Sequence, residues 1–272
     1  MARDSPLRSL LVVFVTAVIC SSIVSGSVVL LRPIQLENQL LRDSVNILRL
    51  SGQLDETTQV DRSVLLEHFK RLDARVINID EAVFDAGLDP YTLDPRKAAS
   101  DPELGVQIPP EQDHAGLGRR SRYVTVYLVW KGKALDRVIL PISGAGMWSM
   151  IRGYLALESD FNTIAAVTFY EQNETPGLGD QIVQPYWQAQ WVGKRIFDET
   201  GSLLFRVAEG PVAPGSPAAE YQVDALTGAT VTANAVSALV QYWMGPHGYG
   251  PMLNRWREQP PQPAASTPGQ ES

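Results

Sequence analysis

Three threonine hydroxyls lie close together in the stretch Asp224 to Thr232, which reads D-A-L-T-G-A-T-V-T. A helix is expected to begin here, because Gly228 breaks the preceding pattern and apolar residues recur at helical spacing from Ala233 to Met244. A hydroxyl at a helix N-terminus faces unpaired N–H groups and the positive end of the helix dipole, which favour a phosphate group. Thr230 is therefore a candidate for a phosphoester. The alternative is that Thr230 and Thr232 only cap the helix.

Two other stretches are rich in glycine. Glu174 to Gly179 reads E-T-P-G-L-G, in which the proline restricts the backbone and the glycines let main chain approach a flat ring closely. An ordinary Pro-Gly turn is the alternative interpretation. Gly144 to Trp148 reads G-A-G-M-W, and Trp148 is placed to pack against the edge of a cofactor, although a glycine turn beside a core tryptophan has the same pattern.

These stretches carry a family resemblance. The threonine stretch resembles the flavinylation motif D-x-x-[ST]-G-A-T, whose last threonine carries FMN through a phosphoester. With an apolar N-terminal helix and both glycine-rich stretches in the same order, the chain resembles the C subunit of the sodium-pumping NADH:quinone oxidoreductase from about Leu11 to about Trp256. The resemblance implies a one-electron carrier within a multisubunit complex, with pumping left to partner subunits.

A related complex is the alternative. The flavoprotein subunit of Rnf-type ferredoxin:NAD oxidoreductases shares the helix, the motif and E-T-P-G-L-G. The longer segment from Leu88 to Gly118 and the sequence Tyr249-Gly250-Pro251 favour the quinone reductase.

The resemblance also implies roles for individual residues. Thr230 carries the covalent FMN, Gly228 and Ala229 leave room for the phosphate and for the flavin transferase that installs it, and Asp224 helps that transferase engage the motif. Apart from the resemblance, Lys194 follows Trp191 and Gly193 and is placed to meet flavin oxygens or the phosphate, unless it is an ordinary solvated lysine. No catalytic side chain is expected, because the flavin does the chemistry. The expected cofactor-binding residues are Thr230, Asp224, Thr227, Gly228, Ala229, Glu174, Thr175, Gly177, Leu178, Gly179, Trp148 and Lys194.

The chain departs from the family pattern in two places. Gln172 and Asn173 stand where His-Gly is expected, and Ala208-Glu209-Gly210 lacks the expected lysine before its glycine. The second departure implies a less positive surrounding for the flavin.

The N-terminal region predicts a membrane anchor. No charged residue occurs between Arg8 and Arg32, and at ~1.5 Å per residue a helix of that length crosses the ~30 Å hydrocarbon layer. A cleaved signal peptide is the alternative, but its apolar core would be unusually long and no A-x-A-like site follows. Arg3 and Arg8 precede the helix, so we expect a single pass through the bacterial inner membrane and its lipid, with the N-terminus cytoplasmic and the main domain periplasmic.

The remaining pattern predicts an α+β fold: an N-terminal transmembrane helix followed by an extracytoplasmic domain with an antiparallel sheet and packed helices. Asp61 is expected to cap a helix whose apolar stripe contains Val64, Leu65, Phe69 and Leu72. The segment Leu88 to Gly118 lacks periodicity and is interpreted as a surface excursion between two lobes. Other expected elements are a connector helix Arg32–Asn46, strands Arg75–Ile79, Thr163–Tyr170 and Leu203–Val207, and a hairpin of Tyr123–Trp130 and Arg137–Ile142.

The expected domain boundaries follow from these elements. They are a cytoplasmic N-terminus (1–8), a transmembrane helix (9–31), a connector with a first lobe (32–122), an FMN-binding lobe (123–258) and a disordered tail (259–272) rich in Pro, Gln, Ser and Ala.

Composition argues against several function classes. A net charge of −7 argues against a nucleic-acid partner, which requires basic clusters. One cysteine, Cys20, provides no disulfide framework, and the three scattered histidines predict no metal site. A hydrolase would need a nucleophile elbow of the type G-x-S-x-G, which is missing. A non-catalytic anchored binding domain would have the same helix and core, but no reason to combine T-G-A-T with E-T-P-G-L-G.

Overall fold

The computed structural model describes residues 6–54 and 61–263. The chain divides into two compact units, Met1–Val45 and Asn46–Ser272. Most of the tail predicted to be disordered, residues 264–272, lies outside the described residues, as does the cytoplasmic N-terminus up to residue 5.

One long helix, α1, runs from Pro6 to Leu50. Its segment Ser9–Leu31, with a mean hydropathy of 2.3, is long and apolar enough to cross a membrane. Hydroxyl groups within this segment donate to the carbonyl four residues earlier, so they are satisfied inside the helix. The predicted connector helix is not separate, because α1 continues through Pro33. A proline in a helix removes one backbone hydrogen bond, and the good helix formers that follow it carry the helix on.

The last turn of α1 belongs to the second unit. Ile47, Leu48 and Leu50 are buried there. Gly52 follows with a φ of 73°, which allows the chain to leave the helix at this point. The Arg137 guanidinium donates to the carbonyl oxygen of Leu50 at 2.9 Å and so satisfies one of the free carbonyls at the helix end.

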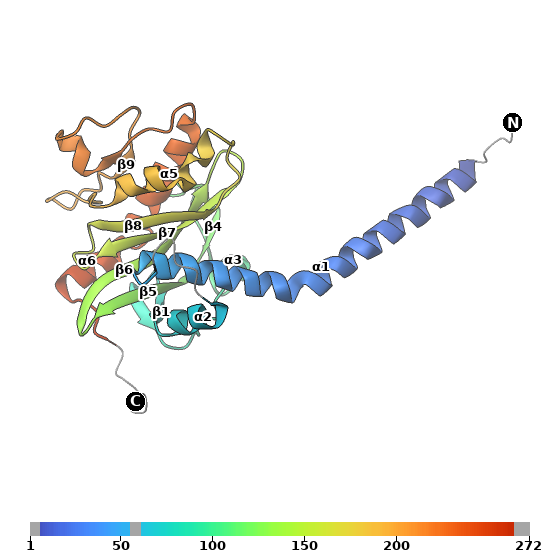
Figure 1. The fold of residues 1–272 in the computed structure, drawn as a ribbon, viewed down its shortest axis with the longest axis horizontal. Coiled ribbons are helices and arrows are strands. Elements are labelled where there is room, and N and C mark those ends of the chain that lie inside the picture. Colours follow the sequence, from blue (N-terminus) through green and yellow to red (C-terminus); the bar gives the residue numbers. More distant parts are fainter. Residues whose placement is uncertain (1–5, 55–60, 264–272) are drawn as a thin grey trace. The chain divides into compact units, whose positions relative to one another are not determined.

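A six-stranded antiparallel sheet forms the centre of the second unit (Figure 1). The predicted hairpin is confirmed: its strands pair up to Lys131 and Ala134, and Gly132 between them has a φ of 65°. The sheet and its helices confirm the predicted α+β fold. The strand order is β2 (Val83–Asp85), β1 (Asp73–Asn78), β5 (Tyr123–Lys131), β6 (Ala134–Ala145), β7 (Met150–Glu158) and β8 (Ile164–Glu171).

Helix α5 (Thr230–Met244) packs against β6. A Cβ atom at Gly144 would lie 2.6 Å from the Leu239 Cβ, so only glycine allows the helix to come this close to the strand. The Trp243 indole donates to the carbonyl oxygen of Ser143 at 2.7 Å and fixes the helix along the strand. Helix α6 (Gly250–Glu258) follows and buries Trp256.

Helix α2 (Arg62–Lys70) is capped as predicted, since the Asp61 carboxylate accepts the N–H of Ser63. Leu65 and Phe69 are buried, but Val64 is 40% exposed and does not belong to the apolar stripe.

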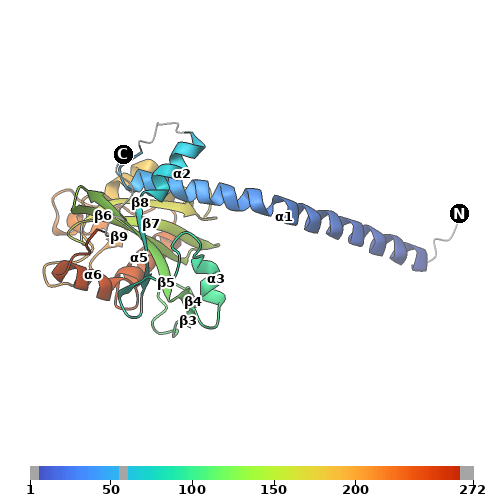
Figure 2. The same cartoon turned by 90° about the horizontal axis from the view of Figure 1, so that it is seen from below.

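The segment 88–118 is more ordered than its sequence predicts. It contains α3 (Pro95–Ser100) and β3 (Gly105–Gln107), which pairs with β4 (Arg119–Ser121), and Figure 2 shows these elements together. The boundary expected at 122/123 falls between β4 and β5, while the six-stranded sheet takes strands from both sides of it.

The chain between β8 and α5 consists of short elements. The predicted strand 203–207 reduces to β9 (Arg206–Val207), which pairs in parallel with β10 (Gln222–Val223). The others are α4 (Pro185–Gln188) and the 3₁₀ helices η1 (Gly179–Val183), η2 (Ala189–Trp191) and η3 (Pro217–Glu220).

Candidate functional site

The Glu174 carboxylate joins the three stretches that the sequence singles out. The side chain, which follows β8, is only 4% exposed. Its Oε1 accepts the backbone N–H of Met147 at 2.9 Å and that of Trp148 at 3.3 Å, both in the loop between β6 and β7. Its Oε2 accepts the hydroxyl of Thr232 in the first turn of α5. One buried carboxylate therefore holds together segments that are far apart in the chain.

The glycines of these stretches make room for that carboxylate. A Cβ atom at Gly146 would lie 2.4 Å from Glu174 Oε1, and a Cβ atom at Gly179 would lie 2.6 Å from Thr232 Oγ1. Real Cβ contacts are not this short, so these two positions require glycine for packing around the carboxylate. The short distances at both glycines show how closely the three stretches pack around Glu174.

An exposed apolar surface adjoins this carboxylate. Trp148 is 66% exposed, which excludes the core-tryptophan interpretation, and its indole donates to the Thr175 hydroxyl at 3.1 Å. Leu178 is 40% exposed, and its Cδ2 would lie 3.0 Å from a Cβ atom at Gly228, whose φ is 75°. At Gly177 the loop is open, since no atom lies within 4 Å of a Cβ built there. This surface suits a flat ring that lies beside the threonine stretch.

The three threonines have different surroundings. Thr232 is 2% exposed and its hydroxyl is bound to Glu174, whereas Thr227 and Thr230 are exposed. Neither Thr230 nor Thr232 caps α5, because the N-cap residue is Ala229 and no side chain bonds to the cap. The first backbone hydrogen bond of the helix is donated by Ala233, so the N–H groups before it have no acceptor within the helix. They are available to an anion near Thr230.

Asp224 is bound by its own domain on three sides. Its Oδ1 accepts the N–H of Val212 at 2.7 Å, its N–H donates to Gln190 Oε1 at 3.0 Å, and its carbonyl accepts the indole N–H of Trp187 at 3.1 Å. None of these partners stood out in the sequence, because each belongs to a different segment without a recognisable pattern.

The departures from the family pattern lie at the edges of the same region. The Gln172 side-chain oxygen accepts the N–H of Glu174, and the N–H of Asn173 donates to Ser149 Oγ at 3.1 Å. Both residues therefore brace the loop that carries Glu174. Glu209 is exposed, next to Gly210, whose carbonyl accepts a hydrogen bond from the threonine stretch.

Lys194 is not among these residues in the structure. Its ammonium donates to the carbonyl oxygen of Ala219 in η3, which no motif contains. The expectation that it reaches flavin oxygens or the phosphate therefore lacks support from the geometry.

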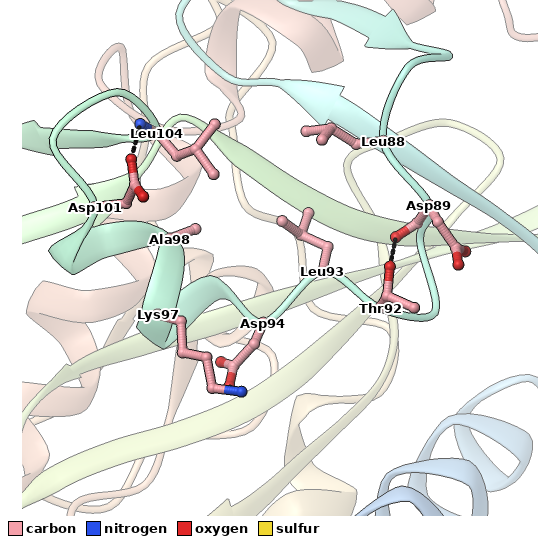
Figure 3. Close-up of a pocket in the computed structure, with 9 residues that line it drawn as sticks. All are labelled: Leu88, Asp89, Thr92, Leu93, Asp94, Lys97, Ala98, Asp101 and Leu104. Carbon is pink, nitrogen blue, oxygen red and sulfur yellow. Dashed lines mark hydrogen bonds and ion pairs between the residues drawn. The ribbon is translucent and has the colours of Figure 1, made fainter.

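A cavity of about 260 Å³ lies elsewhere, around α3 (Figure 3). The sequence did not single it out. Its acidic side chains close local turns: Asp101 Oδ1 accepts the N–H groups of Glu103 and Leu104. Within the described residues, no group of three or more His, Cys, Asp or Glu side chains could hold a metal ion. The lining residues are Leu88, Asp89, Thr92, Leu93, Asp94, Lys97, Ala98, Asp101 and Leu104.

Comparison with known proteins adds a family to this geometry. Residues 146–245 match the family described as FMN-binding domain, a range that includes all three threonines and Glu174. The C subunit of the Na(+)-translocating NADH-quinone reductase of Pseudomonas aeruginosa is 41% identical over 256 residues, which cover 94% of this chain and 98% of that protein. The corresponding protein of Neisseria meningitidis serogroup A is 42% identical over 258 residues, with coverages of 93% and 95%. The crystal structure of NqrC from Shewanella oneidensis matches with a TM-score of 0.72 and 32% identity, covering 82% of this chain and 98% of that one.

Proposed function

Because the chain belongs to the NqrC family, we propose that its FMN is esterified to Thr230. The members of this family are the C subunits of the Na(+)-translocating NADH-quinone reductase, which is an oxidoreductase complex. Within this complex the chain is an FMN electron-carrier subunit. The ester joins the FMN phosphate to the threonine hydroxyl with net loss of water. Bound FMN supplies the electron-transfer chemistry, while the chain attaches, orients and shields it. Family membership favours the quinone reductase over the Rnf-type complex.

The contrast among the threonines carries the proposal. An ester can form only on a hydroxyl that the transferase can approach. Thr230 is exposed and belongs to the first turn of α5, where free N–H groups favour a phosphate. The Thr232 hydroxyl is buried and bound to Glu174. Thr227 is exposed but lies before the helix, so a phosphate there would lack the same N–H groups.

The exposed faces of Trp148 and Leu178 suit the isoalloxazine ring. Apolar surface that a ring covers is removed from water at a gain of roughly 25 cal/mol per Å². Glu174 would support this wall without touching the ring, since both of its carboxylate oxygens already accept hydrogen bonds from the protein. Of the expected cofactor-binding residues, we therefore retain Thr230, Gly228 and Ala229, residues 175–179 and Trp148 as contacts of the cofactor, and not Lys194. Glu174 and Asp224 support the site through hydrogen bonds within the protein.

The site can be tested by the mass of the intact protein, with and without a co-expressed flavin transferase. We expect an increase of one FMN less one water, mapped by peptide mass analysis to Thr230. Thr230→Val keeps the side-chain shape without the oxygen, so it should fold and carry no covalent FMN. Thr227→Val is the matched control and should be flavinylated. FMN on Thr227 or Thr232, or FMN still attached in Thr230→Val, would overturn the assignment.

For the membrane we propose a single pass through the inner membrane by Ser9–Leu31, with the domain in the periplasm, where the transferase would act. Sodium translocation would then belong to partner subunits, because one helix offers no ion path. Reporters fused after Glu258 test the orientation. An export-dependent reporter should be active and a cytoplasm-only reporter silent, and the reverse pattern would refute the orientation.

A further inference from the structure

The carboxylate of Asp224 fastens a second segment to the threonine stretch. The parallel pair of β9 and β10 continues beyond its two strand residues: the N–H of Ala208 donates to the carbonyl of Val223 at 2.9 Å, and the N–H of Ala225 donates to the carbonyl of Gly210 at 3.2 Å. The bond from the Val212 N–H to Asp224 Oδ1, at 2.7 Å, is the next link along the same line. Where the backbone pairing of the two segments ends, the Asp224 side chain therefore provides the next hydrogen bond between them.

The backbone of Asp224 is itself held in place, so its hydrogen bond to Val212 starts from a fixed position. Its own N–H and carbonyl are held by Gln190 and Trp187, so its backbone is fixed from one side. Trp187 is 2% exposed and belongs to the core. Through its carboxylate, Asp224 therefore holds residues 208–212 at a fixed place relative to the core.

We propose that Asp224 is a positioning residue for flavinylation: its carboxylate holds the 208–212 segment against residues 223–225, and so keeps this segment in one place beside the turn that presents Thr230 to the transferase. This inference rests on the proposed function of Thr230. It differs from the expectation that the transferase reads the acid directly, because the acceptor oxygen matters here and the charge does not.

Four variants separate the two roles. Asp224→Asn keeps a carbonyl oxygen that can accept the Val212 N–H and loses the charge. Asp224→Ala loses both. Val212→Pro removes the donor while the carboxylate stays intact, and Val212→Ala is its matched control, since it keeps the N–H and shortens the side chain.

The rate of FMN incorporation is measured by in-gel flavin fluorescence after the transferase is induced in cells that already contain each variant. We expect Asp224→Ala and Val212→Pro to slow incorporation on the order of 10-fold, the upper end of the effect expected for one lost hydrogen bond. Asp224→Asn and Val212→Ala should stay within about threefold of the wild-type rate. The double variant Asp224→Ala with Val212→Pro should be no slower than either single variant, because both remove the same bond.

Hydrogen exchange of the Val212 amide provides a readout that does not depend on flavin. Exchange should be faster in Asp224→Ala than in the wild type, and nearly unchanged in Asp224→Asn. The inference is overturned if Asp224→Asn is as slow as Asp224→Ala while Val212→Pro keeps the wild-type rate, or if exchange is unchanged in Asp224→Ala. Covalent FMN in Thr230→Val would instead refute the proposed function, so the two failures are distinguishable.

Discussion

Acidic side chains hold two irregular regions of the domain, but they hold them over different distances along the chain. Glu174 binds Met147, 27 residues away, and Thr232, 58 residues away. Around α3, Asp101 binds N–H groups two and three residues ahead, and Asp113 binds those four and five residues ahead. The local turns can form on their own, whereas the Glu174 contacts exist only when three separate segments have folded together.

This difference explains why the surface that we propose for the flavin lies at Glu174. A surface that serves a large cofactor needs groups from several segments, and a buried carboxylate with three donors fixes their separation. A local Asx turn fixes only its own loop. The variants below test whether the two regions differ in this way.

The largest effect is expected from Glu174→Ala. Three donors lose their acceptor, and each buried unpaired group costs ~1–3 kcal/mol, so we expect a loss of about 3 kcal/mol in the free energy of unfolding together with poor flavinylation. Chemical denaturation measures the first and flavin fluorescence the second. Glu171→Ala is the control: this half-exposed residue pairs with Arg96 and Arg152, and its loss should cost under about 1 kcal/mol. Equal losses in both variants would contradict the central role of Glu174.

A smaller effect is expected from Thr232→Val. This change leaves one buried carboxylate oxygen without its donor, at ~2 kcal/mol, and leaves the Thr230 hydroxyl in place. Thr232→Ser keeps the donor and should lose only the methyl packing, ~1 kcal/mol. Both variants should still carry FMN by mass spectrometry. A Thr232→Ser variant that is as unstable as Thr232→Val would mean that the hydrogen bond to Glu174 contributes no more than the methyl group.

The smallest effect is expected from Asp101→Ala in the α3 region. Water can replace the carboxylate at the partly exposed N–H groups of this turn, so we expect a loss of ~0.5–1 kcal/mol. The flavin content and absorbance spectrum should equal those of the wild type. A change in either property would show that the turn at Asp101 and the region around Glu174 are coupled.

Several elements were predictable because their signals are local. The Asp61 cap, the β5–β6 hairpin and α5 each depend on residues within one turn or one strand pair. Strand β7 was missed, because it is buried along most of its length and gives an apolar run without alternation. The short elements α3, β3 and β4 were missed because elements of three to six residues carry too few positions for a pattern.

The meeting of the three stretches could be predicted only in its parts. The motifs singled out Thr230, the 174–179 loop and Trp148 as candidates, and the structure brings the three stretches together around Glu174. The hydrogen bonds of Glu174 to these stretches could not be predicted from the sequence, because they join residues that have no fixed spacing. Lys194 shows the opposite case: its position near Gly193 suggested an anion contact, and a carbonyl of η3 binds it instead.

The burial of the end of α1 also decides how a soluble version of this protein should be cut. The membrane segment ends at Leu31, yet Ile47, Leu48 and Leu50 fill the core of the second unit, and Arg137 binds the helix end. A truncation that removed the whole helix would leave a cavity where these side chains are buried, and the partly buried Arg137 guanidinium would keep Asp136 but lose the Leu50 carbonyl as an acceptor. A truncated chain that starts near Asn46 retains this last turn, so Ile47, Leu48 and Leu50 stay with the soluble domain and are not removed with the anchor.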